Sequence, residues 1–174
     1  LMTLAGFALD GMTRDLGWRF MSCGRRIERL EWTCAMLRHA IAAGRDAEIE
    51  WALRLADSAV TYRSRYMAKP EWLPVLDLLI RDASNPRSIG FQLGGLQDTV
   101  QRIGRSLGEF RDTRLAAAVE ALDGLDPAHD LDPESPRLRA LLAEWQGLAV
   151  TLSEQISRRF FSHVVEDRHE SVSA

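Results

Sequence analysis

The sequence contains a single lysine, Lys69, so almost every positively charged side chain is an arginine. Its 22 lysine and arginine residues are outnumbered by 25 acidic ones, which gives a formal net charge of −3. A protein that binds nucleic acid or an anionic membrane by electrostatics needs an excess of positive charge. We therefore expect neither nucleic acid nor a membrane among the partners of this chain.

Cysteine is also scarce. The two cysteines, Cys23 and Cys34, are eleven residues apart within one predicted helix. At about 1.5 Å of rise per residue their backbones lie roughly 16 Å apart, which is too far for a disulfide. We expect two reduced thiols in the core, which is typical of a cytoplasmic protein.

Long apolar runs are absent too. No run approaches the about 20 residues that span a bilayer, and no signal peptide is recognisable. The chain begins at Leu1 without an initiator methionine and enters an apolar segment at once. We interpret it as the later part of a longer protein.

The chain lacks the signatures of the common enzyme classes. It has no glycine-rich phosphate loop and no Gly-x-Ser-x-Gly nucleophile motif. The histidines are scattered, without a second ligand one helical turn away. The acidic stretch 123–136 lacks the ligand spacing of a calcium loop. We predict no metal and no cofactor, and we recognise no catalytic constellation.

What the sequence does contain is helical spacing of apolar residues, with almost no strand signal. Helices are predicted over residues 2–9, 14–43, 46–69, 72–81, 86–107, 112–123 and 135–161. The predicted fold is therefore all-α, an antiparallel bundle of about four long helices with extra short ones. Gly90 and Gly94, one turn apart, indicate a close helix contact. Residues 1–165 form one helical domain, and residues 166–174 are a flexible tail.

The segment from Arg14 to Ile41 carries two apolar stripes at helical spacing. One consists of Phe20, Cys23, Ile27, Leu30, Cys34, Leu37 and Ile41. The other lies on nearly the opposite side and consists of Trp18, Met21, Arg25, Glu28, Trp32 and Ala35. A surface helix normally has one apolar stripe, so we expect this helix to be covered on both sides.

Arg25 and Glu28 interrupt the second stripe and are the first candidates for a site. Under a covering layer their charges would be costly unless they were paired. One interpretation is an intrahelical ion pair between residues three apart, in a partly covered groove. The other is that Arg25 offers its donors to a carboxylate or phosphate while Glu28 orients it.

Residues 85–92 form the second candidate. Asn85-Pro86 is typical of a helix N-cap followed by proline at the first helical position. Arg87 would then lie in the first turn, where the helix dipole disfavours a cation, so we expect a negative partner nearby. The expected partners are Asp82, Glu28 or a ligand anion. Ser88 would assist the cap, and Gln92 would extend the polar patch.

Both segments resemble the signatures of a known family. Gly17-Trp18-Arg19-Phe20 with Gly24-Arg25-Arg26-Ile27-Glu28-Arg29, and Asn85-Pro86-Arg87-Ser88-Ile89-Gly90-Phe91-Gln92-Leu93, are similar to those of the alpha-E domain, a bacterial helical domain named for its glutamate–arginine motif. The resemblance covers essentially the whole chain and corresponds to the later half of a full alpha-E protein. The candidate site residues that it implies are Arg25, Glu28, Arg29, Asn85, Pro86, Arg87, Ser88 and Gln92.

The alpha-E family often occurs fused to, or encoded beside, ATP-grasp ligase-like and transglutaminase-like proteins. The resemblance therefore implies an accessory or scaffolding role, without chemistry of its own, beside such a partner in amide-bond formation or processing. One alternative is an anion- or carboxylate-binding or catalytic domain built on the arginine–glutamate cluster. Another is an oligomerisation module whose second stripe meets another copy of the chain.

Overall fold

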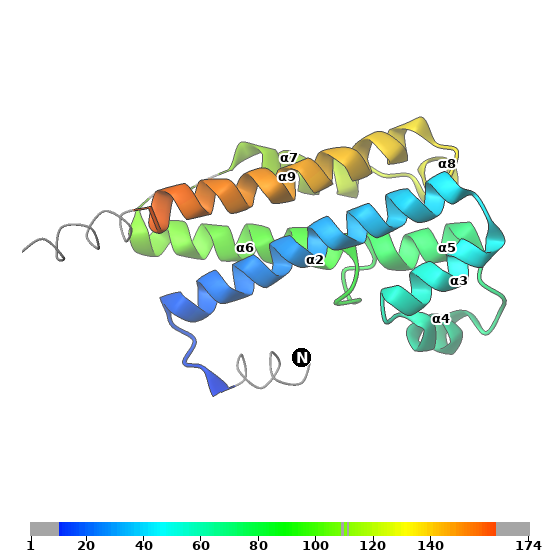
Figure 1. The fold of residues 1–174 in the computed structure, drawn as a ribbon, viewed down its shortest axis with the longest axis horizontal. Coiled ribbons are helices and arrows are strands. Elements are labelled where there is room, and N and C mark those ends of the chain that lie inside the picture. Colours follow the sequence, from blue (N-terminus) through cyan, green and yellow to red (C-terminus); the bar gives the residue numbers. More distant parts are fainter. Residues whose placement is uncertain (1–10, 109, 111, 163–174) are drawn as a thin grey trace, which may run out of the picture.

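The computed structural model describes residues 11–108, 110 and 112–162, and every regular element in these residues is a helix (Figure 1). This confirms the all-α class predicted from the sequence. The predicted helix over residues 2–9 and the predicted tail over 166–174 lie outside the described residues. No helix in the described ranges is both long and apolar enough to cross a membrane.

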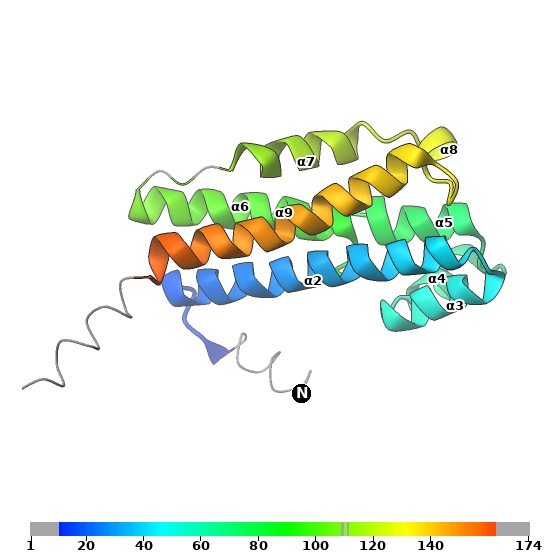
Figure 2. The ribbon, with the colours of Figure 1, turned by 45° about the horizontal axis from the view of Figure 1, so that its top comes forward.

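The bundle is built from α2 (Leu16–Ala43), α6 (Ile89–Leu107), α7 (Thr113–Asp123) and α9 (Pro136–Phe160), with the short α8 (Pro127–Asp130) between the last two. α2 lies against both α6 and α9, and both run in the opposite direction to it (Figures 1 and 2). α7 packs against α6 and α9. The remaining short helices gather near the end of the molecule where α2 finishes.

α2 ends at Ala43 as the sequence predicts and begins at Leu16, two residues after the predicted start. The Asp15 side chain accepts a hydrogen bond from the Trp18 amide at 3.0 Å and so caps the helix start. Gly44 ends the helix in a left-handed conformation with a φ of 63°, which glycine adopts without strain. The first apolar stripe faces inward, and all its residues are buried except the half-buried Phe20.

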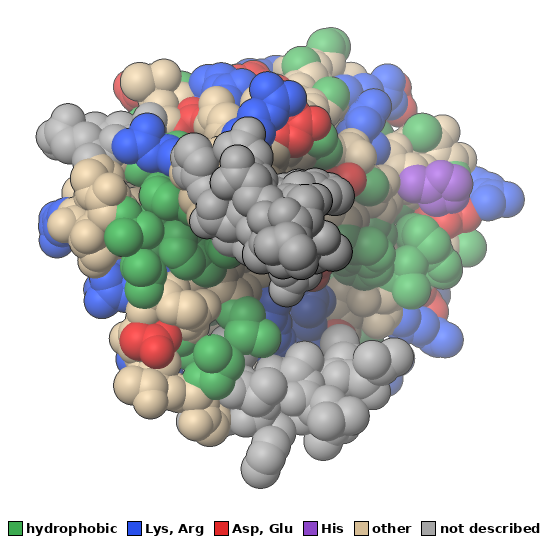
Figure 3. All heavy atoms as spheres, turned by 60° about the vertical axis from the view of Figure 1, so that its left-hand side comes forward, with side chains coloured by type: hydrophobic (Ala, Val, Ile, Leu, Met, Phe, Trp, Pro, Cys, Tyr) green, Lys and Arg blue, Asp and Glu red, His purple; other side chains and the backbone are tan. Residues whose placement is uncertain are grey.

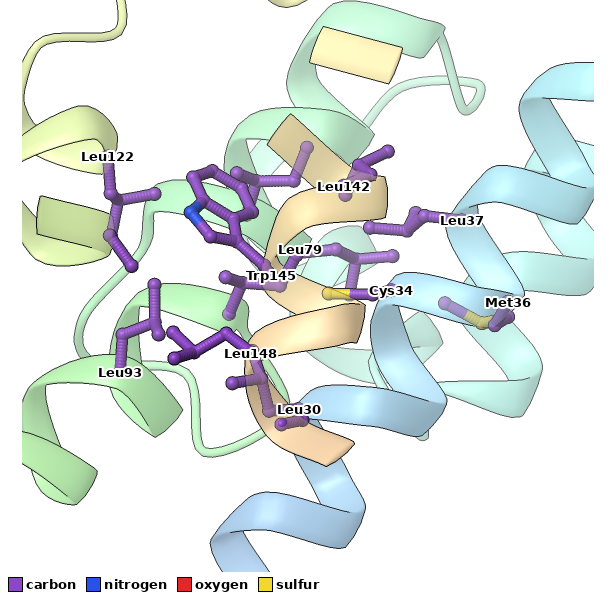
Figure 4. Packing of buried hydrophobic residues seen from close by; sticks show 14 of the residues in the cluster. Leu30, Cys34, Met36, Leu37, Leu79, Leu93, Leu122, Leu142, Trp145 and Leu148 are labelled. Atoms are coloured by element: carbon purple, nitrogen blue, oxygen red, sulfur yellow. The ribbon is translucent and has the colours of Figure 1, made fainter. Parts of the chain in front are cut away.

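The core lies between α2, α6 and α9, and Figure 4 shows Trp145 of α9 surrounded by leucines from several helices. Trp145 is fully buried. Its Nε1 is the one buried side-chain nitrogen or oxygen in the described residues without a hydrogen-bond partner. The large apolar area of the ring offsets the cost of that unpaired donor. Cys23 and Cys34 are buried and free, as predicted.

The segment predicted as one helix over residues 46–69 is divided into α3 (Asp46–Leu55) and α4 (Ala59–Tyr66). The division comes at Asp57, whose φ of 50° is left-handed. Neither glycine nor proline marks this break in the sequence, so the spacing of apolar residues alone predicted one continuous helix. Val60, which a single helix would turn inward, is 81% exposed.

α5 (Trp72–Leu76) continues directly into a turn of π-helix, η1 (Asp77–Arg81). Gly90 of α6 packs against the end of this turn, and a Cβ there would lie 2.9 Å from the Arg81 carbonyl oxygen. Only glycine fits such a close backbone approach. A Cβ at Gly94 would meet no atom within 4 Å, so the close contact predicted for Gly94 is wrong.

Candidate functional site

The second stripe of α2 faces solvent. Met21 and Trp32 are 44% and 40% exposed, and the Arg25 and Glu28 side chains between them are exposed as well. The predicted cover over this stripe and the predicted burial of the Arg25–Glu28 pair are therefore wrong. We call this stripe the open face of α2; it consists of Trp18, Met21, Arg25, Glu28, Trp32 and Ala35.

Apolar side chains also reach the surface at the end of the molecule where α2 begins. Figure 3 shows hydrophobic side chains there beside basic side chains. Leu107 and Phe161, which lie where α6 and α9 finish, are 44% and 48% exposed. Phe161 forms an edge contact with Phe20, with 5.1 Å between the ring centres. Exposed apolar area is therefore not confined to the open face.

The loop over residues 82–88 joins η1 to α6 and is anchored by Asn85. Asn85 is 5% exposed. Its Nδ2 donates to the Leu78 carbonyl oxygen at 3.0 Å and to Ser58 Oγ at 3.3 Å, and its Oδ1 accepts from the Arg87 amide at 3.1 Å. Both ends of the amide group are used by the protein, so Asn85 holds the loop in place.

The N-cap of α6 is Ser88, so the prediction that Asn85 caps this helix is wrong. Ser88 Oγ accepts a hydrogen bond from the Phe91 amide at 3.0 Å and donates one to the Asp82 carbonyl oxygen at 2.6 Å. Serine and asparagine are both good caps, but the Asn85 amide is already used by Leu78 and Ser58, which leaves Ser88 to cap the helix. Arg87 consequently precedes the helix and does not lie in its first turn.

Gln92 and Arg26 tie α6 to the loop and to α2. Gln92 Nε2 donates to the Pro86 carbonyl oxygen at 2.6 Å. Arg26 donates from Nη1 to the Phe91 carbonyl oxygen at 3.1 Å, and its guanidinium lies 4.8 Å from the centre of the Phe91 ring. Burial lowers the pKa of Arg26, against the smaller opposite effect of nearby Asp98. Sequence reasoning did not identify Arg26 as a helix-joining residue.

Gly95 provides the space that Arg26 occupies. A Cβ at this position would overlap the Arg26 guanidinium. The adjacent glycines Gly94 and Gly95 are the sequence signal that could have found this contact, because a glycine in mid-helix costs stability and needs a reason. The reason is the passage of an arginine side chain from α2.

Arg87 forms an ion pair with Asp57, which the sequence analysis did not identify. Arg87 Nη2 lies 2.8 Å from Asp57 Oδ2. The negative partner expected for Arg87 is therefore present, but it is neither Asp82 nor Glu28. Asp82 pairs with Arg65 instead.

The backbone explains why Asp57 needs a positive partner. Asp57 follows the last turn of α3, where the Ser58 amide donates to the Leu53 carbonyl oxygen at 2.9 Å. This hydrogen bond closes the helix as a Schellman-type cap with Asp57 in its left-handed position. The C-terminal end of a helix dipole disfavours a carboxylate, and Arg87 offsets that effect.

Arg29 of α2 is half-buried. Burial is the main cause that lowers the pKa of its guanidinium, followed by the positive charges of Arg87 and Arg25. Asp57 and Glu28 have smaller, opposite effects on that pKa. The loop that carries Arg87 reaches this part of α2, because Thr33 Oγ1 donates a hydrogen bond to the Arg87 carbonyl oxygen at 3.5 Å.

An open groove of about 470 Å³ runs along this part of α2. Its lining consists of Arg25, Glu28, Arg29, Glu31, Trp32 and Ala35. It therefore combines donors, acceptors and an indole, which is suited to binding and has no evident nucleophile. No cluster of His, Cys, Asp and Glu suited to a metal ion occurs within the described part of the chain.

The structure divides the predicted site residues into two groups. Arg25, Glu28 and Arg29 lie along the groove, and the Arg87 backbone contacts α2 at Thr33, about one turn beyond Arg29. The other group stabilises the loop and the start of α6; it consists of Asn85, Pro86, Ser88 and Gln92. The groove residues are the better candidates for contact with another molecule, since their polar groups are open to solvent.

Comparison with known proteins finds a family described by an ER motif. The Alpha-E family, described as a predicted alpha-helical domain with a conserved ER motif, matches residues 1–161. Glu28-Arg29 is the single Glu-Arg dipeptide in the sequence. No solved structure matches the chain.

Uncharacterized proteins of Mycobacterium tuberculosis and Mycobacterium bovis are similar to the chain, each 34% identical over 150 residues. The similarity covers 83% of this chain and 17% of each relative, so the chain spans about a sixth of their length. With the family match over nearly the whole chain, these observations lead to one conclusion: the chain belongs to the Alpha-E family.

Proposed function

We propose that this chain is a non-catalytic accessory domain that docks an ATP-grasp ligase-like partner through the open face of α2. The observation that carries the proposal is the exposure of Met21 and Trp32 on a helix whose other face is packed. Methionine and tryptophan are enriched at protein interfaces, and tryptophan is a frequent energetic anchor. The charged side chains between them would fix the register of the partner.

The choice of partner rests on family context. The chain resembles a family whose members are found fused to, or beside, ATP-grasp ligase-like proteins, with transglutaminase-like proteins as a second candidate. The mycobacterial relatives extend far beyond the region that they share with this chain. That length supports a domain that works next to other protein segments.

The experiment mixes the purified chain with the ATP-grasp ligase-like protein encoded nearest to it and measures binding by calorimetry. We expect a complex that Trp32→Ala weakens at least tenfold, because truncating an aromatic anchor typically costs about 2 kcal/mol or more. The turnover of the ligase-like protein is measured in the same samples. We expect it to change when the chain is added and to change less with the variant.

Trp51→Ala is the matched control. Trp51 is 38% exposed, close to the value for Trp32, but it lies on α3 and packs against His39. The control should bind as the unaltered chain does. No complex, or an equal loss with both variants, would contradict the proposal. A homodimer that Trp32→Ala dissociates would support the oligomerisation module instead.

A further inference from the structure

Arg29 differs from its neighbour Arg26 in that the protein does not use its donors. Within residues 11–108, 110 and 112–162, no acceptor takes a hydrogen bond from the Arg29 guanidinium and no carboxylate forms an ion pair with it. The single buried side-chain nitrogen or oxygen without a partner in those ranges is Trp145 Nε1. Solvent therefore reaches the Arg29 nitrogens, and a small solute can do the same.

Arg87 lies against α2 about one turn beyond Arg29, because Thr33 Oγ1 donates a hydrogen bond to its carbonyl oxygen at 3.5 Å, and after burial its charge is the next cause that lowers the pKa of Arg29. Its side chain is 23% exposed, and its ion pair with Asp57 uses one of its nitrogens. The backbone of Arg87 is held in place, because its amide donates a hydrogen bond to Asn85 Oδ1 at 3.1 Å. Two like charges held close together repel each other, and a single anion between them removes that repulsion.

The rest of the groove limits the charge of such an anion. Glu28 and Glu31 line the groove, and their carboxylates would repel a ligand with two negative charges. They would accept hydrogen bonds from amide or ammonium groups of the same ligand. Trp32 and Ala35 provide an apolar wall along the same side of the helix.

We infer that Arg29 and Arg87 bind the carboxylate of an amino acid or short peptide, whose body lies against Trp32. Arginine is suited to this role because its planar donors match the geometry of a carboxylate. The inference needs no protein partner, so it stands or fails separately from the docking proposal. A chain that binds its partner but no carboxylate would overturn this inference alone.

The test uses the isolated chain and follows the Nε–Hε signals of its arginines by NMR during titration with N-acetylalanine. We expect saturable shifts of the Arg29 and Arg87 signals, with a dissociation constant on the order of 1 mM for one carboxylate. N-acetylalaninamide has nearly the same shape without the charge and should leave both signals in place. Inorganic phosphate should bind more weakly than N-acetylalanine.

Arg29→Gln and Arg87→Gln should each raise the dissociation constant at least tenfold. Arg54→Gln is the control, since Arg54 is a surface arginine of α3 paired with Glu50, and it should change nothing. Using two variants keeps the test valid if one of them disturbs the fold.

Three results would overturn the inference. One is an equal response to N-acetylalanine and its amide. Another is unaltered affinity in both folded glutamine variants. The third is tighter binding of phosphate than of N-acetylalanine, which would assign the site to a phosphate group.

Discussion

The two faces of α2 have the same apolar spacing in the sequence and opposite environments in the structure. On one face Leu30 and Cys34 are 0% exposed, because α6 and α9 cover them. On the open face Met21 and Trp32 keep 44% and 40% exposure. The spacing of apolar residues identifies which faces of a helix are apolar, but it does not identify what covers each face.

The same contrast separates two arginines only three positions apart. Arg26 takes part in helix packing. It contacts the ring and the carbonyl oxygen of Phe91, and the absence of a side chain at Gly95 provides the space for its guanidinium. Burial, followed by the positive charges of Arg87 and Arg25, lowers the pKa of Arg29, and its donors stay open to solvent. Residue type alone did not separate a structural arginine from a candidate binding arginine; the surroundings of each side chain did.

Truncation should affect the two faces of α2 very differently. Leu30→Ala is expected to cost about 2–5 kcal/mol of unfolding free energy, because it leaves a cavity in a packed core. Trp32→Ala should cost no more than about 1 kcal/mol, because much of that side chain is already in water. Urea unfolding measures both values. Similar costs would show that the open face is packed as tightly as the buried one.

Alkaline pH tests whether the buried face excludes water. Burial raises the pKa of Cys23 to about 12, and it also raises the pKa of Cys34. A thiol in the unfolded chain has a pKa of ~8.5. The contribution of the two buried thiols to the free energy of unfolding is therefore complete below that pH and is lost as the pH rises toward their pKa values in the folded chain. In that range the free energy of unfolding should fall by up to about 1.4 kcal/mol per pH unit for each thiol.

Urea unfolding at pH 8 and pH 10 measures that slope. The double variant Cys23→Ala and Cys34→Ala removes both thiols and should show a much smaller loss between the two pH values. An equal loss in the variant would mean that other groups cause the alkaline instability.

Neighbouring glycines of α6 should respond to alanine with opposite signs. Gly95→Ala displaces Arg26 and is expected to cost about 1–2 kcal/mol, because a charge-assisted hydrogen bond is lost while helix propensity is gained. Gly94→Ala meets no atom within 4 Å and should stabilise by up to about 1 kcal/mol. Thermal unfolding measures both changes.

An Arg26→Ala background is the control for the glycine pair. Without the guanidinium, Gly95→Ala should become stabilising as well. If Gly95→Ala stays destabilising there, then Arg26 is not the reason for glycine at this position.

The Asp57–Arg87 pair should contribute least, because the Asp57 side chain is 71% exposed. Asp57→Asn keeps the left-handed backbone accessible and removes the charge, so it should cost no more than about 1 kcal/mol. It should also tighten the binding of N-acetylalanine, because Arg87 loses its competing carboxylate. Asp57→Ala should be less stable than Asp57→Asn, since alanine rarely adopts a left-handed φ. Weaker binding in Asp57→Asn would argue against a carboxylate site beside Arg87.

Much of the fold could be predicted from local chemistry. The bounds of α2 agree with the predicted range to within two residues, and the first stripe is buried, because caps and apolar spacing act over a few residues. The break at Asp57 could not be foreseen, because a nonglycine residue takes the left-handed position. The choice of Ser88 over Asn85 as a cap could not be foreseen either, because Asn85 is held by the Leu78 carbonyl oxygen and by Ser58, which comes from a separate segment of the chain.

The sequence identified the segments of the candidate site but not the contacts between their residues. The two motifs contain Arg29 and Arg87, yet the expected partner of Arg87 was wrong, since Asp57 comes from a third segment. Arg26 was not identified because its role depends on a gap at Gly95 in another helix. Contacts between separate elements depend on the tertiary structure, so the sequence alone did not identify them.

The most direct test of the central claim is hydroxyl-radical labelling of the chain, alone and with the ATP-grasp ligase-like protein. In the free chain Met21 and Trp32 should label readily, as should Met67 and Trp51, which are 88% and 38% exposed and belong to the end of α4 and to α3 instead of α2. In the complex, labelling of Met21 and Trp32 should fall while that of Met67 and Trp51 stays the same. Weak labelling of Met21 and Trp32 in the free chain, or unchanged labelling in a complex, would contradict the account.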